Sequence, residues 1–219
     1  MFPGPGFHTG VRWGDYTRTE VDSSNGQAFW HINQYAPNGT WHTRIGDFSF
    51  APLTQSAFSR KVHGGSGTFD IPLPPVGNVG VECRTGPTYQ LIVNFVSSVT
   101  VGSVTVTSGT GNVDSFSGSG TQQITINLSG VTDAQKITVT MHNVSDGTRT
   151  GDVPVTMGVL VGDTTGNGSV NAGDVAQTKS QVGQSVGSGN FREDVNASGT
   201  ITATDVAIVK SEAGTSLPP

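Results

Sequence analysis

Hydrophobic and polar residues alternate with a period of two through the middle of the chain. Between residues 55 and 161, short runs rich in Val, Ile and Thr are separated by glycine, proline or aspartate. In one run, Ile124, Ile126 and Leu128 alternate with polar residues, so one face of a strand is apolar. Eight strands are predicted, at residues 59–63, 67–73, 79–84, 90–101, 103–108, 122–128, 136–143 and 153–161. This pattern is typical of an immunoglobulin-like antiparallel β-sandwich.

The first 54 residues have a different pattern, because aromatic side chains are concentrated there. Runs at 13–21, 29–35 and 41–50 predict strands, which form a partial β-sheet and hardly an independent domain. The segment resembles the closing blade of secreted sialidase-like β-propellers over about 40 residues, at Arg12-Trp13-Gly14-Asp15-Tyr16, Phe29-Trp30 and Trp41-His42-Thr43-Arg44-Ile45-Gly46. One blade cannot close a propeller, so a propeller active site is not expected.

The C-terminal segment, residues 162–219, repeats itself at an offset of 31 residues. The identical pairs are Asp163/Asp194, Gly168/Gly199, Asp174/Asp205, Val175/Val206, Ala176/Ala207, Lys179/Lys210, Ser180/Ser211, Gly183/Gly214 and Ser185/Ser216. Two copies of one motif in so short a segment indicate a duplicated supersecondary unit.

Each copy begins with a 12-residue segment whose spacing suits calcium, because a hard cation needs several oxygens from one short loop. Gly168 and Gly199 hold the sixth position, where the chain turns sharply. The candidate ligands are Asp163, Thr165, Asn167, Ser169, Asn171 and Asp174, and then Asp194, Asn196, Ser198, Thr200, Thr202 and Asp205, with Ser169 and Thr200 acting through backbone carbonyls. The sequence therefore predicts two calcium ions, and short helices at 174–182 and 205–213. The alternative for a single loop is an Asp- and Asn-rich turn before a helix.

The paired loops resemble a type I dockerin domain over about 57 residues. The resemblance rests on EF-hand-like loops that end in aspartate, on the helix after each loop, and on Phe191-Arg192 before the second copy. Thr165 departs from the pattern, since aspartate or asparagine usually stands there, and each loop has only two carboxylates. Calcium affinity is therefore expected in the weak extracellular class, with Kd ~10⁻⁴–10⁻³ M.

The resemblance also implies a protein partner, a cohesin, bound through the helix faces that follow the loops. The matching residues are Ala172, Gly173, Lys179 and Ser180 in the first copy, and Ala203, Thr204, Lys210 and Ser211 in the second. The near-symmetry of these faces permits two binding orientations. The alternative is that Lys179 and Lys210 are ordinary solvated helix residues, because dockerin-like domains also occur where no cohesin is known.

Composition excludes several further classes of function. Net charge is −5 with only 11 Lys and Arg residues, so the basic surface that nucleic-acid binding needs is missing. No apolar run approaches the ~18–20 residues of a membrane helix. Cys83 is the only cysteine, which excludes an internal disulfide and predicts a small buried hydrophobe. High Gly, Ser and Thr content with few charges is typical of secreted bacterial proteins. Because residues 1–10 lack signal-peptide features, we expect this chain to be the C-terminal part of a longer protein, or a processed product.

Catalytic motifs are missing from the sequence. The five histidines show no metal-pair spacing, although His31 and His42 are candidates to face each other across a hairpin. Asp15 with Arg12, Arg18 and Arg44 suggests a sialidase-type arginine cluster, but structural pairing at a blade edge is favoured. The chain is therefore predicted not to be an enzyme.

The sequence thus predicts a mainly β protein with three parts: an aromatic-rich β segment (1–54), an immunoglobulin-like sandwich (55–161) and a small dockerin-like α domain of paired calcium loop-helix units (162–219). The expected function is calcium-dependent, non-catalytic attachment in a secreted or cell-surface complex, through a cohesin-like domain. One alternative is an extracellular structural assembly, in which neighbouring copies of the chain associate by strand addition. Another is an accessory region of a carbohydrate-active enzyme, with Trp13, Trp30 and Trp41 stacking on sugars, although burial of these tryptophans is expected.

Overall fold

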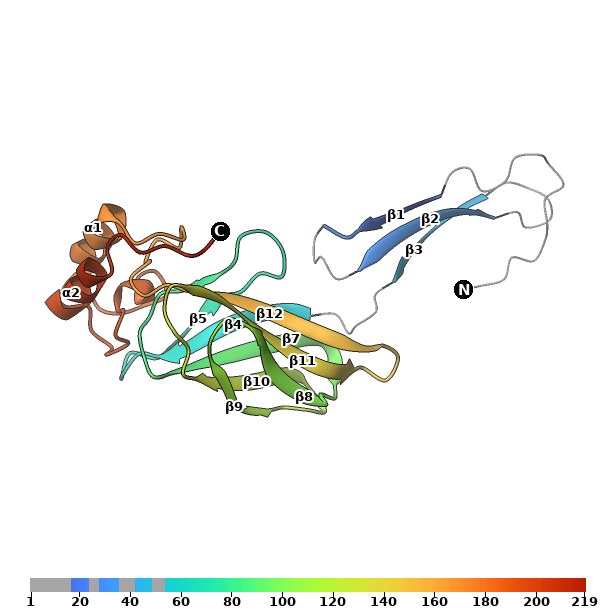
Figure 1. The fold of residues 1–219 in the computed structure, drawn as a ribbon, viewed down its shortest axis with the longest axis horizontal. Helices are drawn as coiled ribbons and strands as arrows, with labels where there is room; N and C mark the ends of the chain where they lie inside the picture. Colours follow the sequence, from blue (N-terminus) through green and yellow to red (C-terminus); the bar gives the residue numbers. More distant parts are fainter. Residues whose placement is uncertain (1–16, 24–27, 36–41, 49–53) are drawn as a thin grey trace.

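The computed structural model describes residues 17–23, 28–35, 42–48 and 54–219. This part of the chain is mainly β, with antiparallel sheets and a small C-terminal helical part, as the sequence predicts (Figure 1). None of the helices within the described ranges has the length and apolar character that crossing a bilayer requires.

Two sheets form the central body of the molecule (Figure 1). The five-stranded sheet has the order β5-β4-β7-β10-β9, and the four-stranded sheet has the order β6-β12-β11-β8. Neighbouring strands are antiparallel except β6 and β12, which pair in parallel. The strands are β4 (Thr54–Val62), β5 (Thr68–Pro72), β6 (Val81–Glu82), β7 (Thr88–Val99), β8 (Ser103–Ser108), β9 (Asn112–Ser117), β10 (Thr121–Ser129), β11 (Gln135–Ser145) and β12 (Thr150–Val159).

Residues from both sheets form one hydrophobic core. On β10, Ile124, Ile126 and Leu128 are fully buried, and Ile137 and Met141 of β11 belong to the same cluster. Burying each such side chain contributes roughly 1.5–3 kcal/mol relative to leaving it exposed. The predicted alternation of apolar and polar residues on these two strands is therefore confirmed.

All eight runs predicted in the body overlap strands, but β9 was not predicted. The run 79–84 is reduced to the two residues of β6. On β9, Val113 and Phe116 are three residues apart, which is not a strand period, yet both pack on the core. A register shift in the pairing of β9 with β10 inserts one extra residue between them, so both side chains reach the same face. Sequence periodicity does not predict such a strand, because the bulge that interrupts the period of two depends on pairing with β10.

A separate three-stranded antiparallel sheet contains β1 (Arg18–Val21), β2 (Phe29–Tyr35) and β3 (His42–Phe48). It lies to one side of the body, and the helices lie on the opposite side (Figure 1). Trp30 is 47% exposed, so the expectation of burial is wrong for this tryptophan, whereas Trp13 and Trp41 lie outside the described residues.

The register of this sheet also overturns the expected histidine pair. His31 lies opposite Gly46, and His42 lies opposite Tyr35, so the two histidines do not face each other. Arg18 pairs with Glu20 on its own strand. Arg12 and Asp15 of the proposed arginine cluster lie outside the described residues.

The C-terminal helical part packs against one end of the body. It contains α1 (Ala172–Gln181), the 3₁₀ helix η2 (Phe191–Glu193) and α2 (Ala203–Ser211). Both α-helices begin two residues earlier than predicted. A second hydrophobic cluster includes Val81 and Leu160 from the body together with Val170, Val195 and Val209. The helical part and the body therefore share this core.

Candidate metal centre

Each predicted calcium loop leads into its helix through a capping box. The Asn171 side chain accepts a hydrogen bond from the Gly173 N–H, and the Asp174 carboxylate accepts one from the Asn171 N–H at 2.9 Å. Thr202 and Asp205 repeat this arrangement before α2. Because these ninth-position residues act as N-caps, the closing aspartates stand inside the first helical turn, where the helix dipole favours negative charge.

Oxygen atoms of the first loop converge. The Thr165 hydroxyl lies 3.3 Å from Asp163 Oδ1 and 2.9 Å from Asp174 Oδ1. The backbone N–H groups of Gly166 and Gly168 each donate to the Asp163 carboxylate at 2.8 Å. The structure therefore brings together the predicted ligands at the first, third and twelfth positions.

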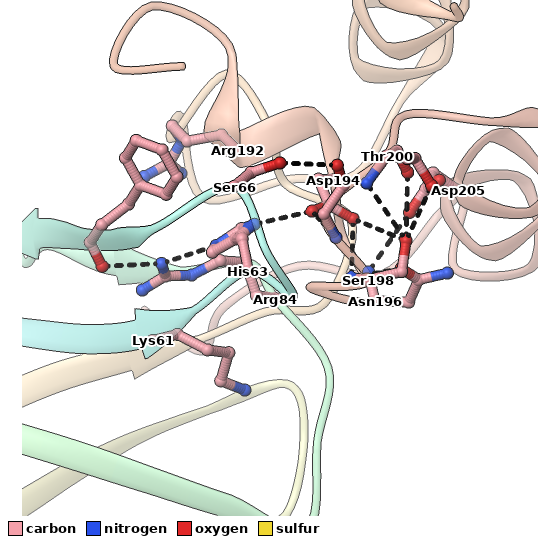
Figure 2. Close-up of polar contacts among 12 residues, drawn as sticks. Lys61, His63, Ser66, Arg84, Arg192, Asp194, Asn196, Ser198, Thr200 and Asp205 are labelled. Carbon is pink, nitrogen blue, oxygen red and sulfur yellow. Dashed lines mark hydrogen bonds and ion pairs between the residues drawn. The ribbon is translucent and has the colours of Figure 1, made fainter. Parts of the chain in front are cut away.

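The second loop gathers a similar set of oxygens. The Ser198 hydroxyl lies 3.3 Å from Asp194 Oδ1 and 3.1 Å from the Thr200 carbonyl oxygen (Figure 2). The Asn196 N–H donates to Asp205 Oδ1 at 3.2 Å, which brings the closing aspartate to the same loop. In the second loop, the structure therefore brings together the predicted ligands at the first, fifth and seventh positions.

The remaining predicted ligands shape the loop backbone. Asn167 accepts a hydrogen bond from the Ser169 N–H at 2.9 Å, and Asn196 accepts one from the Ser198 N–H at 2.9 Å. Asn171 also donates to the Ser169 carbonyl oxygen at 3.3 Å. These amide side chains lie in local turns, where Asn is favoured because it bonds to nearby backbone N–H groups.

The chemistry of the donor set fits a hard cation. Asp163, Asp174, Asp194 and Asp205 are all fully buried. Within the described ranges, none of these four carboxylates pairs with a Lys or Arg side chain, and Asp194 is hydrogen-bonded to His63 at 2.8 Å. Buried carboxylates are costly unless a positive charge accompanies them. In the part of the chain that the structure describes, no group of three or more His, Cys, Asp or Glu side chains is placed so that it could hold a metal ion by itself. Calcium would therefore be held by two carboxylates per loop plus hydroxyl, amide and carbonyl oxygens, as its ligand preference allows.

Backbone pairing ties the two loops to each other's helices. Val170 of the first loop bonds to Thr215 and Gly214 after α2, and Ile201 of the second loop accepts a hydrogen bond from the Gly183 N–H after α1. Val170 and Ile201 are buried. The two copies are therefore held together crosswise.

The residues expected to meet a partner lie on the surface. All eight are exposed: Ala172, Gly173, Lys179, Ser180, Ala203, Thr204, Lys210 and Ser211. They lie on α1 and α2, which are placed side by side at the end of the molecule away from the three-stranded sheet (Figure 1).

Residues 161–212 match the family model of the dockerin type I domain. No curated protein and no solved structure matches the chain. The match confirms the resemblance for the C-terminal part, and no relative supports the blade-like or immunoglobulin-like assignment of the rest. Dockerin domains are non-catalytic modules for protein–protein attachment; they typically bind calcium, bind cohesin partners and occur in extracellular or cell-surface proteins.

The dockerin domain is joined to the body by a buried polar network that the sequence analysis missed. Arg84 forms an ion pair with Glu82 at 2.7 Å, with both side chains fully buried, and Ser59 donates to the same carboxylate. Arg84 Nη1 lies 3.1 Å from His63 Nε2, and His63 Nδ1 lies 2.8 Å from Asp194 Oδ2 (Figure 2). The network thus runs from the body to the first ligand position of the second loop.

The charge state of His63 follows from its neighbours. Burial lowers the pKa of His63, the charge of Arg84 adds to this, and Asp194 opposes it. Arg84 can only donate to Nε2, so the proton of the neutral ring is on Nδ1 and is donated to Asp194. Burial alone would raise the pKa of Glu82, but the hydrogen bonds and charge of Arg84 outweigh it and hold that pKa below its usual value.

Aromatic packing reinforces the same junction. The rings of Phe69 and Phe191 are stacked 5.2 Å apart, and the guanidinium of Arg84 lies 5.5 Å from the Phe191 ring centroid. Phe191 therefore anchors the dockerin domain on the body. In the sequence, only the presence of Glu82 and Arg84 in a short run with Val79, Val81 and Cys83 hints at such a network, and nothing there indicates which charges meet.

Proposed function

We propose that this chain is a calcium-dependent attachment module of a secreted complex, in which the dockerin domain binds two calcium ions and docks on a cohesin-like protein. The two-sheet body, as an immunoglobulin-like sandwich, serves as a spacer. The observation that carries the proposal is the set of four fully buried aspartates in a domain whose helix faces stay exposed. Bound calcium would neutralise the carboxylates and hold the loops in one conformation, while α1 and α2 present the docking face.

A calorimetric calcium titration tests the metal. We expect two sites with Kd ~10⁻⁴–10⁻³ M, because each loop has only two carboxylates. Asp163→Asn and Asp194→Asn should each remove one site, whereas Asp152→Asn, an exposed carboxylate on the body, should leave both. Heat changes that do not depend on Asp163 or Asp194 would contradict the proposal.

The partner is tested with a purified cohesin panel in calcium and in chelator. If the two helix faces offer alternative orientations, Lys179→Glu or Lys210→Glu alone should retain binding, and the double variant should lose it. Arg149→Glu, in the turn between β11 and β12, is the control for a charge reversal away from the helices and the calcium loops. Equal binding by the double variant and the control would exclude these faces as the docking surface.

A second candidate function is association between copies of the chain through the N-terminal sheet. It is favoured by exposed apolar side chains on that small sheet: Val21, Trp30, Ile32, Ile45 and Phe48. Among the strands that the structure describes, β1 and β3 are at its edges and offer backbone groups for strand addition. Light scattering decides between the two functions: attachment predicts a monomer in millimolar calcium and in chelator, and assembly predicts a larger particle.

A further inference from the structure

The turn between β4 and β5 lies directly against the second calcium loop. Ser66 donates from its hydroxyl to the Gly199 carbonyl oxygen at 2.8 Å. A Cβ at Gly64 would lie 2.2 Å from the Ser198 carbonyl oxygen, and one at Gly199 would lie 2.8 Å from the His63 carbonyl oxygen. Such close backbone contact requires glycine at both positions. The body and the second loop are therefore built to fit each other.

His63 fixes the orientation of the first ligand in that loop. Asp194 Oδ2 accepts hydrogen bonds from His63 Nδ1 and the Gly199 N–H, both at 2.8 Å. The other oxygen, Oδ1, is left beside the Ser198 hydroxyl, where the loop oxygens converge (Figure 2).

The first loop lacks this support. Asp163 Oδ2 accepts the equivalent hydrogen bond from the Gly168 N–H, but no side chain of the body reaches either oxygen within the described ranges. Arg192 contacts the first loop only at backbone carbonyls, those of Asp163 and Thr164, at 2.8 Å. Two loops with the same sequence pattern are thus placed in different surroundings.

We infer that the two calcium sites are inequivalent, because His63 and Ser66 of the body are positioning residues for the second site alone. This inference rests on the calcium binding proposed above. Groups that orient a metal ligand typically change metal affinity 10- to 100-fold when they are removed. Calcium in the second loop is accordingly linked to docking of the dockerin domain on the body through His63 and Ser66, and these two contacts are absent from the first loop.

The test measures each calcium site separately, in Asp163→Asn and Asp194→Asn backgrounds, by calorimetry on the full chain. His63→Leu should weaken the second site at least tenfold and leave the first unchanged. His142→Leu is the matched control, since it removes a similar pair, His142–Asp152, on the exposed side of the body. Gly64→Ala should weaken the second site as well, whereas Gly65→Ala, whose Cβ would meet nothing within 4 Å, should not.

A milder variant covers the case in which His63→Leu does not fold. Ser66 is exposed, so Ser66→Ala should fold normally and still weaken the second site severalfold. The rise in melting temperature on adding calcium should also shrink in His63→Leu, but not in His142→Leu. Unchanged second-site affinity in His63→Leu and Ser66→Ala would overturn the inference alone. Absence of calcium binding by the unmodified chain would overturn the proposed function and the inference with it.

Discussion

Arg84 and Glu82 illustrate how a charge becomes part of the interior of this protein. Arg84 also donates to the carbonyl oxygens of Phe69 and Ser59, at 3.0 and 3.1 Å, so all five N–H donors of its guanidinium have an acceptor. A buried ion pair is not by itself strongly stabilising, because desolvation offsets the attraction. Removing one partner is costly, since the other charge is left buried and uncompensated.

Glu82→Gln should therefore lower the free energy of unfolding by about 3–5 kcal/mol, measured by urea denaturation in calcium. The matched control is Asp70→Asn, which breaks the Arg60–Asp70 pair on neighbouring strands of the body. That pair is about one-third exposed, so a loss of only ~0–1 kcal/mol is expected. Similar losses in both variants would show that the buried network does not stabilise the junction.

Cys83 is fully buried, as the sequence predicts, and burial raises the pKa of its thiol to about 12. We expect no reaction with a thiol reagent at pH ~8.5 in the native state, because only the thiolate is nucleophilic. The thiol of the unfolded chain has a pKa of ~8.5. The contribution of Cys83 to the free energy of unfolding is therefore fully present below that pH and is lost as the pH rises toward 12. One thiol should react after denaturation, and fast reaction of the native protein would contradict its burial.

Each sheet of the body has one face that packs in the core and one that faces solvent. β7 and β10 pair along most of their length, and β10 is placed between β7 and β9. Ile126 of β10 is fully buried, whereas Val96 of β7 is 61% exposed. Whether a side chain of one sheet stabilises the fold thus depends on the face it occupies.

Ile126→Ala should reduce the free energy of unfolding by roughly 2–5 kcal/mol, because it leaves a cavity in the core between the sheets. Val96→Ala in the same sheet should change it by no more than ~0.5 kcal/mol, as expected for an exposed position. Chemical denaturation of both variants checks this. A small effect of Ile126→Ala would mean that the two sheets do not enclose a close-packed core.

The body and the dockerin domain are connected by more than a linker. Val81 and Leu160 of the body pack with Val170, Val195 and Val209 in one cluster. The Thr85 N–H donates to the Val195 carbonyl oxygen at 2.7 Å, and the Gly162 N–H donates to the Cys83 carbonyl oxygen at 3.0 Å. These contacts therefore hold the two helices in a fixed position relative to the body.

Scanning calorimetry in saturating calcium should show one cooperative transition for the body and the dockerin domain together. In excess chelator, the loop carboxylates lose their counter-charge, and a separate transition at lower temperature is expected for the dockerin domain. Val195→Ala, which alters the shared core, should separate the transitions even in calcium. Two independent transitions in the unmodified protein with calcium would show that the interface contributes little.

Much of this architecture follows from local patterns. Period-two alternation located the strands of the body except β9, and the repeat at an offset of 31 residues located both loops and both helices. These features are readable because the residues that specify them are neighbours in the chain. The helix starts differ by two residues because Asn171 and Thr202, named as ligands, are also N-caps.

The rest depends on contacts between segments far apart in the sequence. β9 faces the core through a bulge set by β10, and Trp30 is exposed although an aromatic-rich segment suggests a core. His63 and Asp194 are 131 residues apart, and no local pattern links them. The shared pattern of the two loops is a property of their sequence, whereas their inequivalence arises because the β4–β5 turn packs on only one of them.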